Sequence, residues 1–342
     1  MMSVDVTTGS RLHFGLLSAE AGLPWHYGGV GLMIDSPGWR VRVSFARCDE
    51  VVSAVGDDCE AAARVDSIVK QCRAVMPELP PLRVEMLESS PLHSGMGAGT
   101  QLALSVASAA QLIAGNSAGE SLYSIARSLN RVRRSAIGTA GFERGGFLVD
   151  HGQRQSQCSR QLTAAPTCNR VRRLPFPDEW RMVLLTPVAG SGVSGDSEEA
   201  VFQKSRTMSD EVMALQIDLI EHRLIPAIDA IDFATFRDAL EEYGTAVGRY
   251  FTAEQGGVFS SPLIADAVSW LAERGVSGAV QSSWGPTVCV PAESADAARS
   301  VRDLLASWHA AGAIRVRVAN PLNTGATIRR TAPEHSDQRF FA

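Results

Sequence analysis

Three glycines at alternating positions, Gly95, Gly97 and Gly99, stand directly before a long apolar segment. Because glycine has no Cβ, successive backbone amides of such a loop can turn inward and meet the positive end of the following helix dipole. A phosphate group is the expected ligand. The candidate phosphate-binding residues of the loop are Ser94, Gly95, Met96, Gly97, Ala98, Gly99, Thr100 and Gln101.

The loop matches neither of two common nucleotide-binding motifs. No Gly-Lys-Ser/Thr follows it, as a Walker A loop requires, and its glycines are spaced differently from those of the dinucleotide fingerprint. A glycine-rich turn that only packs a helix closely against a sheet is the competing interpretation, and the loop alone does not decide between the two.

A second segment, residues 131–146, combines arginines with glycine turns. Arginine recognises phosphate or carboxylate with two parallel hydrogen bonds, so Arg133, Arg134 and the neighbouring Ser135 are candidate phosphate ligands. A solvated basic helix end that offsets its own dipole is the alternative, and for any single arginine it is the commoner case. The group as a whole favours a binding site.

Two further segments could supply substrate contacts. Residues 281–288 (QSSWGPTV) offer hydroxyls, an indole and a Gly-Pro turn, although a partly buried core tryptophan is the commoner role for the indole. The candidate substrate-binding residues here are Ser282, Ser283, Trp284, Gly285 and Thr287. Near the N-terminus, Arg11 and His13 share one face of a predicted short strand. Arg11 is a candidate substrate ligand and His13 a candidate catalytic residue. A lone histidine there is more often structural.

Composition excludes several classes of protein. The 342 residues carry a net charge of −5, so no nucleic-acid partner is expected. Six cysteines without a CxxC pair indicate reduced thiols, and therefore a cytoplasmic protein without disulfides or structural zinc. The N-terminus lacks a signal-peptide pattern and no apolar run approaches the roughly 20 residues of a membrane span, so no membrane partner is expected.

Segments of both hydropathy periods alternate along the chain, which predicts a mixed α and β protein. The predicted strands are residues 41–45, 82–87, 146–150, 181–186, 285–290 and 314–319. The predicted helices are residues 101–114, 209–225, 233–251, 261–274 and 295–311, and residues 60–76 with Ala63, Ile68, Val69 and Cys72 on one side. The polar stretch 153–173 is the candidate boundary between an N-terminal domain, 1–173, and a C-terminal domain, 174–330. From Arg330 on, the chain is expected to be loose, with 331–342 a polar tail.

Taken together, these segments resemble the beta-ribofuranosylaminobenzene 5'-phosphate synthase family, which belongs to the GHMP kinase superfamily. The resemblance covers residues 8–330. Its motifs are SRLHFGLL (10–17), YGGVGLMIDSP (27–37), PLHSGMGAGTQ (91–101), RRSAIGTAGFERGGFLVDHG (133–152), EQGGVFSSP (254–262), QSSWGPTV (281–288) and NTGATI (323–328).

The resemblance implies an α+β, two-domain GHMP kinase-like fold. The N-terminal domain is expected to be similar to ribosomal protein S5 domain 2 and the C-terminal domain to be ferredoxin-like, with the active site between them. The implied activity is that of a pentosyltransferase that condenses 4-aminobenzoate, or 4-hydroxybenzoate, with 5-phosphoribosyl diphosphate. Carbon dioxide and diphosphate leave, and the product is a C-riboside on the path to tetrahydromethanopterin in one-carbon metabolism.

The resemblance also suggests roles for the candidate residues. The departing diphosphate needs preorganised donors and Mg²⁺, the implied cofactor. The loop amides would hold phosphate oxygens. Arg133 and Arg134 would bind the 5-phosphate or the benzoate carboxylate, and Trp284 would stack on the aromatic ring. Glu143 and Asp150 are expected to bind Mg²⁺ or to accept the ring proton. Relatives are often dimeric, so a homodimer is possible.

Two other functions stay open at this stage. The chain departs from the family pattern at Ser18 and residues 23–26, where a substrate contact is expected to be lost or moved. Asn130 and Val132 also depart from it, since they replace glycines expected before the arginines. An ATP-dependent small-molecule kinase would use the same glycine loop, but Trp284 stands where such kinases keep a small-residue turn. A non-catalytic ligand-sensing relative is the third possibility, and the acidic charge without a DNA-binding appendage disfavours it.

Overall fold

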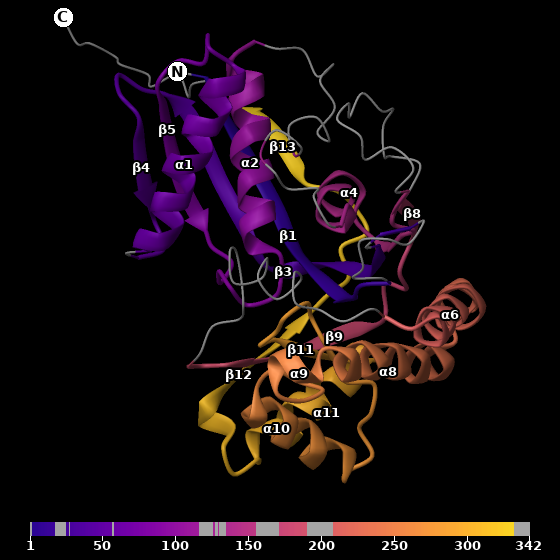
Figure 1. Cartoon of the computed structure of the whole chain (residues 1–342). Helices are drawn as coiled ribbons and strands as arrows, with labels where there is room; N and C mark the ends of the chain where they lie inside the picture. Colours follow the sequence, from indigo (N-terminus) through magenta and orange to yellow (C-terminus); the bar gives the residue numbers. More distant parts are fainter. Residues whose placement is uncertain are drawn as a thin grey trace, which may run out of the picture.

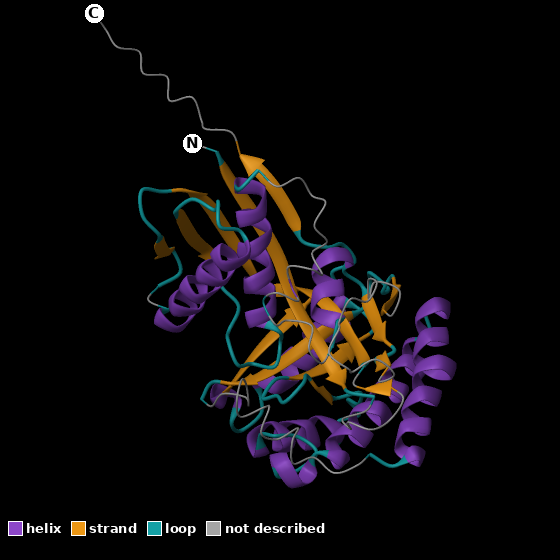
Figure 2. Ribbon diagram, turned by 45° about the horizontal axis from the view of Figure 1, so that its top comes forward, coloured by secondary structure: helices purple, strands orange, loops and turns teal. Residues whose placement is uncertain are grey.

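The structure is a computed structural model that describes residues 2–17, 25–26, 28–56, 58–115, 126, 129, 135–154, 171–189 and 208–331. Within these residues, two large sheets and a two-stranded ribbon, β2 (Trp25–His26) with β7 (Gln153–Arg154), are combined with helices (Figures 1 and 2). The predicted mixture of α and β elements is confirmed. None of the described helices is both long and apolar enough to cross a lipid bilayer.

The first sheet has the strand order β13-β1-β3-β5-β4, and β6 and β8 continue it from β3. Its strands are β1 (Ser3–Gly15), β3 (Gly29–Phe45), β4 (Glu50–Ser53), β5 (Leu82–Glu88), β6 (Phe147–Asp150), β8 (Val171–Leu174) and β13 (Thr327–Thr331). β1 spans two hydrophobic clusters, because Val4 and Val6 pack in one and Leu12 and Phe14 in the other. Its C-terminal end therefore carries Arg11 and His13 to the second half of the molecule.

Two helices, α1 (Cys59–Val75) and α2 (Ala98–Ile113), lie side by side against the first sheet (Figure 1). Asp58 caps α1 by accepting a hydrogen bond from the Ala61 amide. The buried stripe of α1 is Ala61, Val65, Ile68, Val69 and Cys72. Ala63, predicted on that side, is exposed, because it is two residues, or about 200°, away from Ala61 around the helix.

The second sheet has the order β10-β11-β9-β12, and its central strand β9 packs on both faces. Its strands are β9 (Arg181–Pro187), β10 (Val280–Gln281), β11 (Val288–Ala292) and β12 (Ile314–Ala319). Val183 and Leu185 pack with α10 (Pro262–Ala272) and α11 (Ala295–Ala306). Met182 and Leu184 pack with α8 (Phe233–Tyr250) and with the end of β1. The second cluster thus joins the two halves of the chain.

The remaining helices follow the predictions with local differences. The segment predicted as one helix over 209–225 is α6 (Asp210–Asp218), a π-helical stretch (Leu219–Leu224) and α7 (Ile225–Ala230). Ser209 caps it through the Val212 amide. Two shorter helices are α4 (Ile137–Arg144) in the first half of the chain and α9 (Thr252–Gln255), which follows α8.

Four predicted boundaries are corrected by the structure. α2 begins at Ala98 rather than at residue 101, so Gly99 and Thr100 lie in its first turn. β11 begins at Val288 rather than at residue 285, because the residues before it form a turn. α11 ends at Ala306. Arg330 belongs to β13, which pairs with β1, and not to a loose tail.

Strand pairing also crosses the predicted domain boundary. β8 spans residues 171–174, across the proposed division between 173 and 174, and it pairs with β6 of the first sheet. β13 returns residues 327–331 to that same sheet. The division into domains 1–173 and 174–330 stays a prediction, and these two strands tie its halves together.

Aromatic side chains form the centre of the cluster that joins the halves. Phe236 of α8 lies 5.2 Å from Phe176, 5.0 Å from Trp180 and 6.3 Å from Phe147, measured between ring centroids. All four rings are buried. Their interlocked packing fixes α8 against the first sheet.

Phe236→Ala is expected to lower the free energy of unfolding by about 3–5 kcal/mol, because it leaves a cavity among these rings. Urea denaturation measures the loss. Phe45→Ala is the matched control, since Phe45 is 36% exposed, and it should cost only about 1–2 kcal/mol. Equal losses in the two variants would show that the aromatic cluster does not hold the halves together.

Candidate active site

The glycine loop ends at the N-terminus of α2, where the backbone turns left-handed. Gly97 is the N-cap with φ +70, and as a glycine it supplies no side-chain hydrogen bond to the helix. The amides of Thr100 and Gln101 donate to the Gly97 carbonyl oxygen at 3.0 and 3.1 Å. Among the described residues, the amides of Ala98 and Gly99 have no recorded backbone acceptor, as expected for a first helical turn. They are available to an anion.

Arg11 lies directly against this loop. Its backbone amide donates to the Met96 carbonyl oxygen at 2.9 Å. A Cβ added to Gly97 would lie 2.9 Å from Arg11 Nε, and one added to Gly138 would lie 3.9 Å from the same atom. The guanidinium group therefore sits between the loop and the first turn of α4, which explains why glycine is needed at position 97.

The N-termini of α2 and α4 meet at this point. A Cβ on Gly138 would lie 3.2 Å from the Thr100 methyl group, and Gln101 Nε2 donates to the Gly138 carbonyl oxygen at 2.9 Å. The positive N-terminal end of α2 and the Arg11 guanidinium group thus lie together, while the amide at the start of α4 is already bound by the Asp150 carboxylate. This concentration of positive potential favours an anionic ligand.

Arg64 of α1 is a second cation at the loop, and sequence reasoning missed it. A Cβ on Gly99 would lie 2.3 Å from Arg64 Nη1, so the guanidinium group covers the first turn of α2. Its nearest described carboxylate oxygen is Glu60 Oε1, 3.7 Å from Nη2, and that oxygen also contacts His93 Nε2. In the sequence Arg64 is one polar residue of an amphipathic helix, and only the packing of α1 on α2 reveals its position.

The turn at residues 282–285 closes the other side of the loop. Ser282 Oγ donates to the Gly95 carbonyl oxygen at 2.8 Å and accepts from the His13 amide at 3.1 Å. The Ser283 amide donates to the His13 carbonyl oxygen at 2.7 Å. A Cβ on Gly95 would lie 2.3 Å from the Ser282 carbonyl oxygen. The structure therefore brings together three segments that the sequence analysis had singled out separately.

Several predicted ligands have side chains that serve the fold. Ser94 Oγ donates to the Pro91 carbonyl oxygen at 2.7 Å. Gln101 is fully buried, and its Oε1 accepts from Thr8 Oγ1 at 2.8 Å. Thr287 Oγ1 is paired with Thr186 Oγ1 at 2.9 Å. These three side chains position the backbone, so backbone amides, arginines and the Thr100 hydroxyl are the groups of the loop region that can contact an anion.

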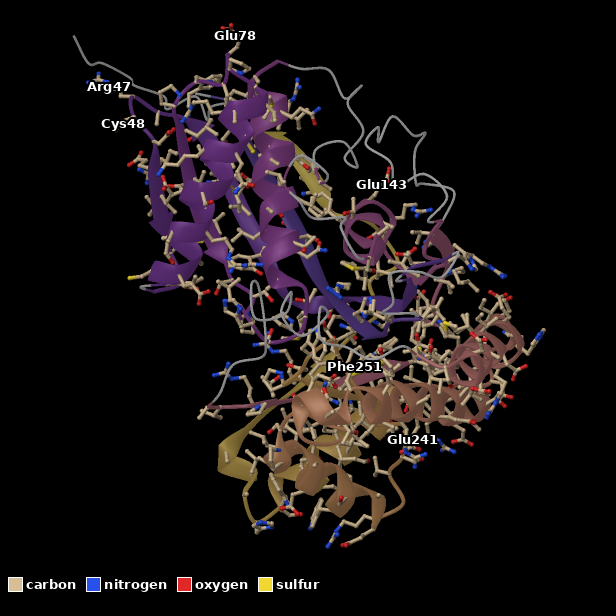
Figure 3. All side chains as sticks on the ribbon, viewed as in Figure 1. Arg47, Cys48, Glu78, Glu143, Glu241 and Phe251 are labelled. Carbon is tan, nitrogen blue, oxygen red and sulfur yellow. The ribbon has the colours of Figure 1, made fainter. Side chains whose placement is uncertain are left out.

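Trp284 lies in the interior beside the turn. Its ring is 6% exposed and makes an edge-on contact with Phe251, with the centroids 4.6 Å apart. Phe251 sits where the two halves of the chain face each other (Figure 3). The geometry favours the alternative of a core tryptophan, and stacking on a substrate ring stays a prediction, as does exclusion of a triphosphate by the indole.

Glu143 and Asp150 do not fit a shared metal centre. Glu143 is exposed and projects from α4 (Figure 3). Asp150 is fully buried, and its carboxylate accepts from the Ala136 amide at 2.8 Å and the Gly152 amide at 3.1 Å. Within the described part of the chain, no group of three His, Cys, Asp or Glu residues is close enough to hold a metal ion. Asp150 instead fixes the start of α4, and Ser135 Oγ accepts from the Ile137 amide there at 3.2 Å.

The other predicted arginines, Arg133 and Arg134, lie outside the described residues, as do Ser18, Asn130 and Val132. Their roles stay predictions. The described part of the segment, residues 135–146, reaches the glycine loop through α4.

Comparisons with known proteins bear on the fold and on the kind of enzyme. A family model described as GHMP kinases C terminal matches residues 224–310. The chain is 27% identical over 300 residues to beta-ribofuranosylphenol 5'-phosphate synthase of Methanothermobacter thermautotrophicus, covering 84% of this chain and 88% of the relative. It is 24% identical over 338 residues to the protein of the same name from Methanocaldococcus jannaschii, covering 92% and 97%. Among solved structures, a homoserine kinase from Cytophaga hutchinsonii has a TM-score of 0.63 at 16% identity, over 96% of this chain and 97% of that one.

The solved structure confirms the predicted α+β, GHMP kinase-like fold, and at its level of identity it shows the fold alone. The chain is an enzyme of the GHMP kinase-like class. Three relatives that match most of its length, at 24–27% identity, are named beta-ribofuranosylphenol 5'-phosphate synthase, so the chain is similar to synthases of the kind that its motifs resemble.

His13 is expected to make folding sensitive to acid. The side chain is 4% exposed, and burial, followed by the charge of Arg11, lowers its pKa well below 6.5. The unfolded chain takes up a proton below about pH 6.5 while the folded chain does not, so this residue removes stability as the pH falls. Between pH 7.5 and 5.5 the loss should be about 1.4 kcal/mol.

Urea denaturation of wild type and His13→Gln at the two pH values measures this contribution. The loss of unfolding free energy on acidification should be about 1.4 kcal/mol smaller in the variant. The same loss in both proteins would mean that His13 is protonated in the folded state.

Proposed function

We propose that this enzyme joins C1 of 5-phosphoribosyl diphosphate to a ring carbon of 4-hydroxybenzoate or 4-aminobenzoate, releasing carbon dioxide and diphosphate. The observation that carries the proposal is the convergence of the α2 N-terminus, Arg11 and the 282–285 turn. This arrangement suits a multiply charged anion, and the resemblance to the synthase family suggests which one.

The reaction changes three bonds. The bond from C1 to the diphosphate oxygen breaks, and the oxygen keeps the electron pair. The ring carbon that bears the carboxylate forms the new bond to C1. The electron pair of the ring–carboxylate bond then returns to the ring as carbon dioxide leaves. Because the carboxylate leaves in place of a proton, no base is needed at the ring, in keeping with the buried, amide-bound Asp150 and the exposed Glu143.

The main task of the protein is to stabilise the charge on the departing diphosphate. Preorganised donors aimed at that charge lower the barrier without reorganising during the reaction. We assign this role to the amides of Ala98 and Gly99, with Arg11 and Arg64 on either side of them. Contacts of Arg133 and Arg134 with the 5-phosphate or the benzoate carboxylate, and a catalytic role for His13, remain proposals.

The names of the relatives favour one of the two proposed aromatic acceptors of the ribosyl group. They are called ribofuranosylphenol phosphate synthases, and a phenol riboside is the product expected from 4-hydroxybenzoate. We therefore rank 4-hydroxybenzoate before 4-aminobenzoate for this chain. Mg²⁺ as cofactor, a homodimer, a cytoplasmic location and a place on the path to tetrahydromethanopterin are carried forward as proposals, without a nucleic-acid or membrane partner.

The decisive assay supplies 5-phosphoribosyl diphosphate with carboxyl-labelled 4-hydroxybenzoate or 4-aminobenzoate, in the presence and absence of Mg²⁺. Release of labelled carbon dioxide together with stoichiometric diphosphate is the expected result. No release, together with ATP turnover on a small alcohol, would replace the proposal by a kinase. Binding of both substrates without turnover of either kind would favour a ligand-sensing protein.

Gly97→Val is expected to abolish this activity while unfolding stays cooperative. The new side chain must enter the space of the Arg11 guanidinium group, and it also strains a residue at φ +70. Steady-state turnover and thermal unfolding are measured on the same preparation. Wild-type turnover in this variant would rule out the loop as the phosphate site.

Gly97→Ala and Gly115→Ala form a matched pair that separates strain from the site. Gly115, just past the C-terminal end of α2, has φ +76, but a Cβ there meets no atom of the described residues within 4 Å. Both variants should lose about 1 kcal/mol of stability from the left-handed backbone. Only Gly97→Ala should lose activity.

A further inference from the structure

Two glutamine side chains connect the 254–262 segment (EQGGVFSSP) to the turn at the site. Gln281 Oε1 accepts from the Ser260 amide at 2.7 Å, and Gln281 Nε2 donates to Gln255 Oε1 at 3.0 Å and to the Ser283 carbonyl oxygen at 3.1 Å. Gln255 Nε2 in turn donates to the carbonyl oxygens of Gly257 and Val258, at 2.9 and 3.0 Å. Both polar atoms of the Gln281 side chain are thus hydrogen-bonded to backbone groups, Oε1 to the Ser260 amide and Nε2 to the Ser283 carbonyl oxygen.

The residue held by Gln281 has an unfavourable backbone conformation. Ser283 has φ +55, in the left-handed region that costs an L-residue about 1 kcal/mol or more. Such a conformation persists where its surroundings fix it. The Ser283 amide is held by the His13 carbonyl oxygen and its own carbonyl oxygen by Gln281 Nε2, so both ends of the residue are fixed.

The 254–262 segment also packs directly behind the turn. A Cβ on Gly285 would lie 2.3 Å from Ser260 Oγ and 2.9 Å from Gln281 Oε1. No room is left between the segment and the turn. Because Ser282 Oγ donates to the Gly95 carbonyl oxygen, a shift of the turn would be transmitted to the glycine loop.

We propose that Gln281 and Gln255 are positioning residues that hold Ser283 left-handed and thereby set the conformation of the glycine loop. Neither side chain needs to touch the substrate. The consequence for catalysis rests on the proposed function, whereas the effect on the loop itself does not.

The direct test is amide hydrogen exchange of the ligand-free full chain by mass spectrometry. Gln281→Met removes both donors and the acceptor at nearly unchanged volume, and it should speed exchange about tenfold in peptides spanning 281–287 and 91–99. Gln71→Met is the matched control, because Gln71 lies on the exposed side of α1 and bonds only Ser67 Oγ among the described residues. Unchanged exchange in peptide 91–99 overturns the proposal. If Gln281→Met does not fold, Gln255→Met tests the same connection.

A rescue experiment separates positioning from general packing. Glycine adopts the left-handed conformation freely, so Ser283→Gly should make the turn less dependent on Gln281. The acceleration caused by Gln281→Met is expected to fall from about tenfold to about twofold in the Ser283→Gly background. An equal acceleration in both backgrounds means that Gln281 acts only as packing, and the proposal fails.

Affinity for inorganic diphosphate, measured by titration calorimetry, links the positioning to the proposed function. Gln281→Met should weaken binding about tenfold, again with rescue by Ser283→Gly. If Gln281→Met exchanges faster than wild type but wild type binds no diphosphate, the positioning role is retained and the proposed ligand is refuted. Wild type that binds diphosphate, with an equally tight Gln281→Met variant, would refute the positioning role and leave the ligand.

Discussion

A single hydroxyl group joins the three segments on which the site depends. Ser282 Oγ donates to the Gly95 carbonyl oxygen and accepts from the His13 amide, and so it ties the turn before β11 to the glycine loop and to β1. The Ser283 amide adds a second bond from the turn to β1. The loop comes from the first half of the chain and the turn from the second, so the proposed anion site is complete only when the two halves are packed together.

This dependence explains the sizes of the side chains around the loop. Gly95 lies against the carbonyl oxygens of the turn, which leave no room for a Cβ, while Gly97 lies against Arg11 and Gly99 against the end of Arg64. A helix end stabilises an anion by about 0.3–1 kcal/mol, whereas a hydrogen bond to a charged group contributes about 1.5–3 kcal/mol. The two arginines are therefore expected to contribute more to affinity than the helix dipoles. The glycines are needed so that the arginines can come close.

Sequence reasoning found what is local and missed what is tertiary. The glycine loop, the buried helix after it and most amphipathic elements follow from spacing and turn chemistry, which are encoded within a few neighbouring residues. α2 begins three residues before the predicted start, because glycine favours a loop in sequence although Gly99 fits a first helical turn. Arg64 gave no signal at all, since its role comes from helix packing. In the sequence, Asp150 is a carboxylate near glycines and therefore a candidate metal ligand. Only the folded structure shows that two backbone amides donate to it. Long strands such as β1 and β3 were recognised only in part, because their two halves face different cores.

The central claim, that the α2 N-terminus binds the diphosphate of the donor, is tested most directly by a crystal structure of the protein with inorganic diphosphate. The account predicts phosphate oxygens within hydrogen-bonding distance of the amides of Ala98 and Gly99, with the guanidinium groups of Arg11 and Arg64 on either side. Diphosphate bound elsewhere, with the α2 N-terminus occupied only by water, would contradict it.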